Sequence, residues 1–444
     1  MTVRAPLLAG GVLDGGRFVS YETLRSDPFR LTEGCPPGAR IALRSDDALA
    51  VLGALLTLDG RVDEVWLLPA ALPPTGDEGL TRLIGELGMG QATRHEWGGV
   101  GIDRWVGPST GSGAGATVLA PVPTPTPTAS PTPVPAETSW VVLTSGTTGT
   151  PKPVRHTLRS LSRAVHRSVG PLVWGLAFDP NRMAGLQLLL QASATEAGLV
   201  TAPLADPLGA RVQRWRDGGV DALSATPSLW RRILQLPDLQ AWPLRRITLG
   251  GEIADQRLLD ALHARFEGAR VTHVFASTES GTAFSVGDGR AGFPARYLSE
   301  PPRGIRLEIR DGVLHVANTA SSAAGADGFV STGDVVEVSG DRVLFRGRAS
   351  GVVNIGGAMV WPEQVEALLR THPDVVDAVV TATPNPLAGN LLLASVVPAA
   401  DVDTAALRGG LRAWVRARAS AAHVPARVSV VERVEHPVTG KAQR

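Results

Sequence analysis

The regular alternation of strand-like and helix-like segments in the middle of the chain most constrains its fold. The strand-like runs are Gly198–Thr201, Ala222–Ser224, Arg246–Leu249 and Val271–Phe275, and the helical ones are Leu208–Arg216, Pro227–Leu234 and Ala254–Phe266. This order is typical of a parallel sheet covered by helices. We therefore expect an α/β fold whose large amino-terminal part contains parallel or mixed sheets.

The first 110 residues show the same rhythm before the composition changes. Ile41–Leu43 and Glu64–Leu68 predict strands, and Asp47–Leu58 predicts a helix between them. From about residue 107 to 135 the chain consists mainly of Pro, Thr, Ser, Gly and Ala, including PVPTPTPTASPTPVP. Such a segment cannot bury a core, so we expect an extended connection there.

The last third of the chain changes to short β runs and then to a small α+β pattern. IRLEIRDGVLHVAN and VVEVSGDRVLFRG each predict a hairpin. A helix at Glu363–Leu369, strands at Ala378–Thr381 and Leu392–Val397, and a helix at Thr404–Arg418 follow. We place the boundary between an amino-terminal core, residues 1–348, and a small carboxy-terminal domain, residues 349–444.

Composition narrows the class of protein. A hydrophobic fraction of 43% and a charged fraction of 19% are typical of a soluble globular chain, and a net charge of +1 gives no reason to expect nucleic acid or a membrane as partner. Cys35 is the single cysteine, which excludes an internal disulfide and suits a reducing compartment. No apolar run reaches the roughly 18 residues of a spanning helix, and no signal peptide is evident. We expect a cytoplasmic monomer or homodimer.

Lysine is almost absent from this chain. Lys and Arg total 43, and the only lysines are Lys152 and Lys441, which leaves 41 arginines. A lysine retained against this bias indicates a task that a planar guanidinium does not perform, such as placing one compact, mobile charge in a phosphate site.

Lys152 ends a loop that has the composition of an anion-binding site. The apolar strand Trp140–Leu143 leads into TSGTTGTPKP, and a helix over Leu158–Val169 is expected after it. Glycines let backbone N–H groups turn toward an anion, and hydroxyls donate further hydrogen bonds. The loop lacks the GxxxxGK[ST] order of a Walker motif.

With these residues in view, the chain resembles the adenylate-forming superfamily of acyl-CoA synthetases, peptide-synthetase adenylation domains and luciferases. TSGTTGTPK resembles the signature phosphate loop of that superfamily. Five further segments follow in the same order, namely Gly250-Gly251-Glu252, Phe275-Ala276-Ser277-Thr278-Glu279, Phe329-Val330-Ser331-Thr332-Gly333-Asp334, Gly347-Arg348 and Pro437-Val438-Thr439-Gly440-Lys441. Both lysines thus fall at lysine positions of the pattern.

The resemblance implies a role for each matching residue. ATP or AMP contacts are implied for Thr144, Ser145, Gly146, Thr147, Thr148, Gly149, Gly250, Gly251, Glu252, Phe275, Ala276, Ser277, Thr278, Asp334 and Arg348. The resemblance implies that Phe275 faces adenine and that Asp334 and Arg348 hold the ribose. Catalytic roles are implied for Lys441, Lys152 and Glu279, with Mg²⁺ held by Glu279 and Thr148. Ser350 would be the hinge about which the carboxy-terminal domain rotates after adenylation. ATP and Mg²⁺ are the implied cofactors.

The acid substrate and the acceptor are less constrained. We expect Phe178, Arg182, Gly185, Thr226 and His273 near a small, flat or short acid. Pro153, Ala276 and Arg182 depart from residues common in the family, so three readings stay open. The first is transfer of the acyl group to CoA or a carrier-protein thiol. The second is the same ATP chemistry with an amine acceptor, or with nitrite to diazotise an aryl amine, and the third is a non-catalytic nucleotide-binding regulator.

Overall fold

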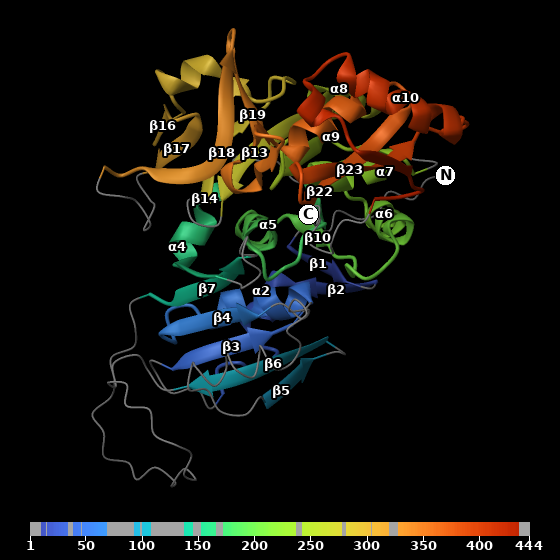
Figure 1. Cartoon of the computed structure of the whole chain (residues 1–444). Coiled ribbons are helices and arrows are strands. Elements are labelled where there is room, and N and C mark those ends of the chain that lie inside the picture. Colours follow the sequence, from blue (N-terminus) through green and yellow to red (C-terminus); the bar gives the residue numbers. More distant parts are fainter. Residues whose placement is uncertain are drawn as a thin grey trace. The chain divides into compact units, whose positions relative to one another are not determined.

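The computed structural model describes residues 10–14, 16–33, 39–45, 47–68, 93–97, 100–107, 137–144, 152–165, 172–236, 242–277, 281–302, 304–318 and 327–434. These residues form two compact units (Figure 1). Unit 1 comprises Met1–Asp206 with Gln213–Val220, and unit 2 comprises Pro207–Val212 with Asp221–Arg444.

Unit 1 contains a six-stranded sheet with the order β5-β6-β3-β4-β7-β8. Its strands are β3 (Arg40–Arg44), β4 (Glu64–Leu68), β5 (Thr93–Trp97), β6 (Val100–Gly107), β7 (Ser139–Thr144) and β8 (Lys152–His156). Strands β3, β4 and β7 are parallel, and the remaining pairs are antiparallel. Helix α2 (Ala48–Thr57) connects β3 to β4, as predicted for Asp47–Leu58, and Asp47 caps its amino end.

The second group of strands in unit 1 is β1 (Gly11–Asp14), β2 (Arg17–Ser20), β9 (Val173–Leu176) and β10 (Gly198–Val200). Strand β1 runs parallel to β10, and β10 runs parallel to β9. Helix α5 (Met183–Ala194) connects β9 to β10, and helix α1 (Tyr21–Arg25) follows β2.

The prediction of a helix over Leu158–Val169 is wrong in the length of the helix. Helix α4 covers Leu158–Leu161 only, a 3₁₀ turn, η1, covers Ser162–Ala164, and Val165 is extended. Ser160 bonds back to the backbone of Thr157 in a capping box, and serines compete with the helix for backbone partners in this way. Residues 166–169 lie outside the described part of the chain.

Unit 2 begins with parallel strands and their helices. Its strands are β11 (Ala222–Ala225), β12 (Arg246–Gly250) and β13 (Arg270–Ser277), with β14 (Gly281–Val286) antiparallel to β13. Helix α7 (Pro227–Leu234) connects β11 to β12, and α8 (Gln256–Arg265) connects β12 to β13. Helix α6 (Leu208–Asp217) precedes them in the sequence and is divided between the two units after Val212. This is the alternation that the sequence predicted.

The two predicted hairpins form a five-stranded sheet with the order β15-β19-β18-β17-β16. Its strands are β15 (Phe293–Pro294), β16 (Ile305–Arg310), β17 (Val313–Asn318), β18 (Val330–Ser339) and β19 (Arg342–Arg348), with the 3₁₀ turn η3 at Ala295–Leu298. Strand β16 pairs with β17, and β18 with β19, both antiparallel. Both hairpin predictions are confirmed.

The end of the chain forms a further five-stranded sheet with two helices. The strands are β20 (Val353–Ile355), β21 (Ala358–Val360), β22 (Val375–Asn385), β23 (Gly389–Pro398) and β24 (Arg427–Val430), and 3₁₀ turns lie at Ala349–Gly351, η4, and Ala421–His423, η5. Helices α9 (Pro362–Arg370) and α10 (Thr404–Arg416) bury Val365, Leu369, Leu411 and Val415 in one core. The small α+β pattern predicted for this region is confirmed.

The described chain is therefore the mixed α/β protein expected from the sequence. Strands β22 and β23 are longer than predicted because they form one continuous hairpin, closed by Asn385 and Gly389. Within the described ranges, no helix has the length and apolar character needed to cross a membrane.

Candidate active site

Three predicted segments of unit 2 meet at one edge of the parallel strands. Strands β11, β12 and β13 are neighbours, and Ala225 pairs with Leu249, which pairs with His273. Thr226, the turn Gly250–Glu252 and the segment from His273 onward therefore lie at the carboxyl ends of adjacent strands. In α/β sheets this edge is where ligands bind.

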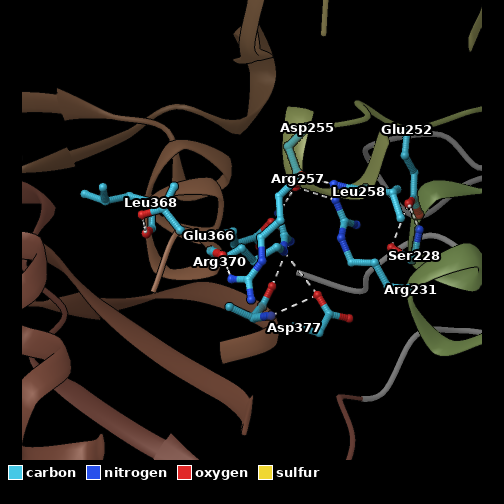
Figure 2. A network of polar contacts seen from close by, with 12 residues as sticks. Ser228, Arg231, Glu252, Asp255, Arg257, Leu258, Glu366, Leu368, Arg370 and Asp377 are labelled. Atoms are coloured by element: carbon cyan, nitrogen blue, oxygen red, sulfur yellow. Dashed lines mark hydrogen bonds and ion pairs between the residues drawn. The ribbon is translucent and has the colours of Figure 1, made fainter. Parts of the chain in front are cut away.

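The helix that follows Thr226 is fixed at this edge by two side chains. Thr226 caps α7 by accepting a hydrogen bond from the N–H of Leu229 at 3.2 Å. Glu252 reaches the same helix end, where its Oε2 accepts from the N–H of Ser228 at 2.9 Å and from the Ser228 hydroxyl at 2.6 Å. A carboxylate suits a helix amino terminus, because the unpaired N–H groups there carry partial positive charge. The glutamate of the predicted nucleotide turn thus holds the helix next to it (Figure 2).

The two glycines of this turn differ in whether the local backbone requires glycine. Gly251 has φ +80°, which L side chains rarely adopt. Gly250 does not, and a Cβ placed on it would meet nothing closer than the Val274 carbonyl oxygen at 3.8 Å. The fold itself therefore has room for a side chain at Gly250. A bare backbone at that point suits close approach of a ligand.

His273 is buried and neutral beside the turn. It is 4% exposed, and its Nε2 lies 3.1 Å from the carbonyl oxygen of Glu252. Because a carbonyl only accepts, we assign the ring proton to Nε2. Burial lowers the pKa of His273 to about 4. Its Nδ1 and the Oε1 of Glu252 are buried atoms with no hydrogen-bond partner among the described residues.

Phe275 lies in a cluster of aromatic rings. Its ring stacks on Phe284 at 4.7 Å and on Phe345 at 4.8 Å, and it contacts the His273 ring at 4.3 Å. The ring remains partly exposed, and only this part is left for the predicted contact with adenine. Since Phe345 belongs to β19, the stack also connects β13 to the strand that carries Arg348.

Asp334 and Arg348, predicted to hold the ribose, are brought together. They are paired residues of β18 and β19, and Arg348 Nη1 donates to Asp334 Oδ1 at 3.0 Å. Next to them Gly347 has φ +146°, and a Cβ there would lie 2.7 Å from Trp361 Cδ1. The indole Nε1 of Trp361 donates to the Arg348 carbonyl at 3.1 Å, so Trp361 packs against the backbone of Gly347 and Arg348 just before Ser350. Ser350 itself is exposed in η4.

The predicted acid-site residues of unit 1 have structural contacts of their own. Arg182 Nη1 donates to the carbonyl oxygen of Leu143 at 2.9 Å, one residue before the phosphate loop begins. A Cβ on Gly185 would overlap the carbonyl oxygen of Asp179, so close packing alone requires this glycine. Phe178 is half-buried. Arg182 thus ties the end of β7 to the start of α5.

Several predicted residues lie outside the described part of the chain. They are Ser145, Gly146, Thr147, Thr148, Gly149, Thr278, Glu279 and Lys441. Thr144, Lys152 and Ser277 are described by their backbone, with Thr144 paired to Lys152 between β7 and β8. Among the described residues, no group of three or more His, Cys, Asp or Glu side chains is arranged to hold a metal ion.

One residue of the site, Ser228, and one contact, between the ring of His273 and the carbonyl oxygen of Glu252, were missed from sequence. Ser228 and the buried His273–Glu252 contact join segments more than 20 residues apart, and only the proximity of Ser228 to Pro227 at a predicted helix start gave any signal. Long-range partners of this kind leave no periodic trace in a single sequence.

Two protein-family models match this chain. Residues 85–312 match the family model "AMP-binding enzyme", and residues 364–441 match "AMP-binding enzyme C-terminal domain". The chain belongs to the AMP-binding enzyme family. The predicted membership of the adenylate-forming superfamily is confirmed.

Individual relatives of this AMP-binding enzyme agree with the family. The 2-succinylbenzoate–CoA ligase of Geobacillus kaustophilus is 27% identical over 344 residues, which are 69% of this chain and 68% of the relative. ATP-bound MatB from Rhodopseudomonas palustris has a TM-score of 0.73 at 19% identity, covering 98% and 94% of the two chains. The amide bond synthetase McbA from Marinactinospora thermotolerans has a TM-score of 0.66 at 20% identity, covering 97% and 94%. The chain spans about half the length, 53%, of other curated CoA-ligase relatives.

Proposed function

We propose that this chain is an ATP-dependent, AMP-forming ligase that adenylates a small carboxylic acid and passes the acyl group to the thiol of CoA or of a carrier protein. The observation that carries the proposal is the meeting of Thr226, Gly250–Glu252 and His273 at one edge of parallel strands. Aryl acids are the first class to test, because an aromatic cluster adjoins this edge and a relative acts on 2-succinylbenzoate.

In this proposal the nucleotide lies along the carboxyl edge of β12 and β13. The open backbone at Gly250 would face adenine, together with the exposed part of Phe275. Asp334 would accept hydrogen bonds from the ribose hydroxyls, with Arg348 orienting the carboxylate through its ion pair. Thr226 and the amino end of α7 would border the acid.

The chemistry requires the acid oxygen and the α-phosphate to be aligned while negative charge builds on the departing pyrophosphate. Catalysis of such transfers is mainly alignment and cationic stabilisation. We propose that the loop 144–152 with Lys152 binds the β- and γ-phosphates and that Lys441 bridges the acid and the α-phosphate. Glu279 and Thr148 are oxygen donors of the type that Mg²⁺ prefers, and a bound Mg²⁺ would neutralise phosphate charge there.

The carboxy-terminal domain, residues 349–444, would turn about Ser350 between adenylation and transfer.

The second candidate function uses an amine as the acceptor or nitrite as the activated acid. Pro153, Ala276 and Arg182 depart from the residues common in the family and are compatible with this second function. We also propose a cytoplasmic location.

One assay decides between these readings. Pyrophosphate release from ATP and Mg²⁺ is followed with a panel of aryl and short acyl acids and nitrite, each with and without CoA or an amine. Acid-dependent release with thioester formation supports the main proposal. Release that yields an amide, or that needs nitrite and an aryl amine, supports the second candidate. No release with any acid, while ATP still binds, would mean a nucleotide-binding regulator.

A further inference from the structure

The start of α8 holds the end of α9, more than 100 residues further along the chain. The guanidinium of Arg257 donates to the carbonyl oxygens of Arg370, of His372 at 2.7 Å and of Pro373 at 3.1 Å. The last carbonyls of a helix have no partner within the helix and carry partial negative charge. Arg257 therefore adds a cation from α8 to the end of α9, whose own last turn already contains Arg370 (Figure 2).

A second contact joins the same two segments. Asp255, the cap of α8, accepts from the N–H of Leu258 at 2.9 Å and pairs with Arg231 of α7 at 2.6 Å. It also lies 3.7 Å from Arg370 Nη1. Burial opposes ionisation of Asp255, but Arg231 and Arg370 together hold its pKa below the usual range. The aspartate is thus charged and shared between α7 and α9.

Each side of this contact keeps its own partners if the two segments separate. Arg370 pairs with Glu366 at 3.2 Å and with Asp377 at 3.1 Å, and both carboxylates belong to its own small domain. Asp255 would retain Arg231 and the Leu258 N–H. An isolated buried charge, which is the main cost of breaking a buried ion pair, would therefore not be created. Arg257 alone would exchange its three carbonyl partners for water.

A specific contact whose charged groups keep other partners after the two segments separate is suited to docking and release. We propose that Asp255 and Arg257 are positioning residues that dock the carboxy-terminal domain, residues 349–444, against α8 during one part of the reaction cycle. Because α8 follows directly after the Gly250–Glu252 turn, the docking contact is adjacent to the nucleotide site. This inference rests on the proposed function, in which the docked domain carries Lys441.

The test compares Arg257→Gln with Arg408→Gln in the full-length protein. Arg408 is an exposed arginine of α10 in the same unit, so its replacement removes the same charge without touching the contact. Asp255→Asn is a second variant, since asparagine retains helix capping but loses the charge. Arg257→Lys, which keeps the charge but loses the planar fork, measures partial rescue.

Two readouts are needed. Hydrogen exchange followed by mass spectrometry should show faster exchange over residues 370–378 and in the first turn of α8 for Arg257→Gln and not for Arg408→Gln. The ratio of the acid-dependent ATP–pyrophosphate exchange rate to the rate of single-turnover acyl transfer should change at least about fivefold, the lower end of ordinary coupling between sites. The KM for the acid should stay unchanged, and Arg257→Lys should restore part of the ratio.

Unchanged hydrogen exchange in Arg257→Gln would overturn the docking contact itself. Faster exchange with both half-reactions slowed in proportion would overturn its role in the cycle. If the unmodified protein performs neither half-reaction with any acid, the proposed function fails, while hydrogen exchange still decides whether the contact holds the two segments together.

Discussion

Burial of a neutral histidine at the candidate site predicts that acid destabilises the protein through His273. The unfolded chain binds a proton at this residue near the ordinary pKa of 6.5, whereas the folded chain does so only near pH 4. Between these values the unfolded state holds more protons, so the free energy of unfolding falls as the pH falls. One pKa unit corresponds to 1.36 kcal/mol, so His273 should lower the free energy of unfolding by about 2 kcal/mol at pH 5 and by about 3 kcal/mol at pH 4.

The perturbation that isolates this effect is His273→Gln, since glutamine retains a donor for the Glu252 carbonyl and does not titrate. Urea unfolding of both proteins at pH 7 and pH 5 gives two pH-dependent changes in the free energy of unfolding. The change should be about 2 kcal/mol larger in the unmodified protein. Equal changes in the two proteins would refute the assignment of His273 as buried and neutral.

Three further substitutions test the site. Gly185→Ala should lower the free energy of unfolding by about 1–3 kcal/mol in urea titrations, because its Cβ would overlap the Asp179 carbonyl. Gly250→Ala should leave stability within about 0.5 kcal/mol but weaken ATP binding at least about tenfold by calorimetry, because the fold has space for the methyl group and the proposed ligand does not. Equal ATP affinity in Gly250→Ala would remove adenine from that position. Arg348→Ala should raise the KM for ATP about tenfold or more through loss of its pair with Asp334, with the KM for the acid unchanged; the opposite pattern would contradict a ribose site.

The parts of the fold that follow local rules could be predicted from the sequence. Helices α2 and α8 lie within the predicted ranges Asp47–Leu58 and Ala254–Phe266, because in each a capping aspartate precedes a segment with apolar residues at helical spacing. The hairpins β16–β17 and β18–β19 follow from alternating residues around glycine turns. Helix α5 was not predicted, because apolar residues cover most of its circumference and hide its period.

The contacts that build the site could not be predicted in the same way. The pairing of Glu252 with Ser228, and of Arg182 with the Leu143 carbonyl, depends on which strands become neighbours. A motif locates Glu252 and Arg348, but only the fold shows that one holds α7 and the other holds Asp334. The roles of Lys152, Glu279 and Lys441 stay predictions of the motif.

The central claim is that two scarce lysines serve one acid-activation reaction, and Lys441 tests it most directly. Acid-dependent exchange of labelled pyrophosphate into ATP is measured for the unmodified protein and for Lys441→Ala, with ATP binding by calorimetry as the control for folding. The account predicts exchange in the first, a loss of about 10²-fold or more in the second, and ATP binding in both. Full exchange in Lys441→Ala would contradict it.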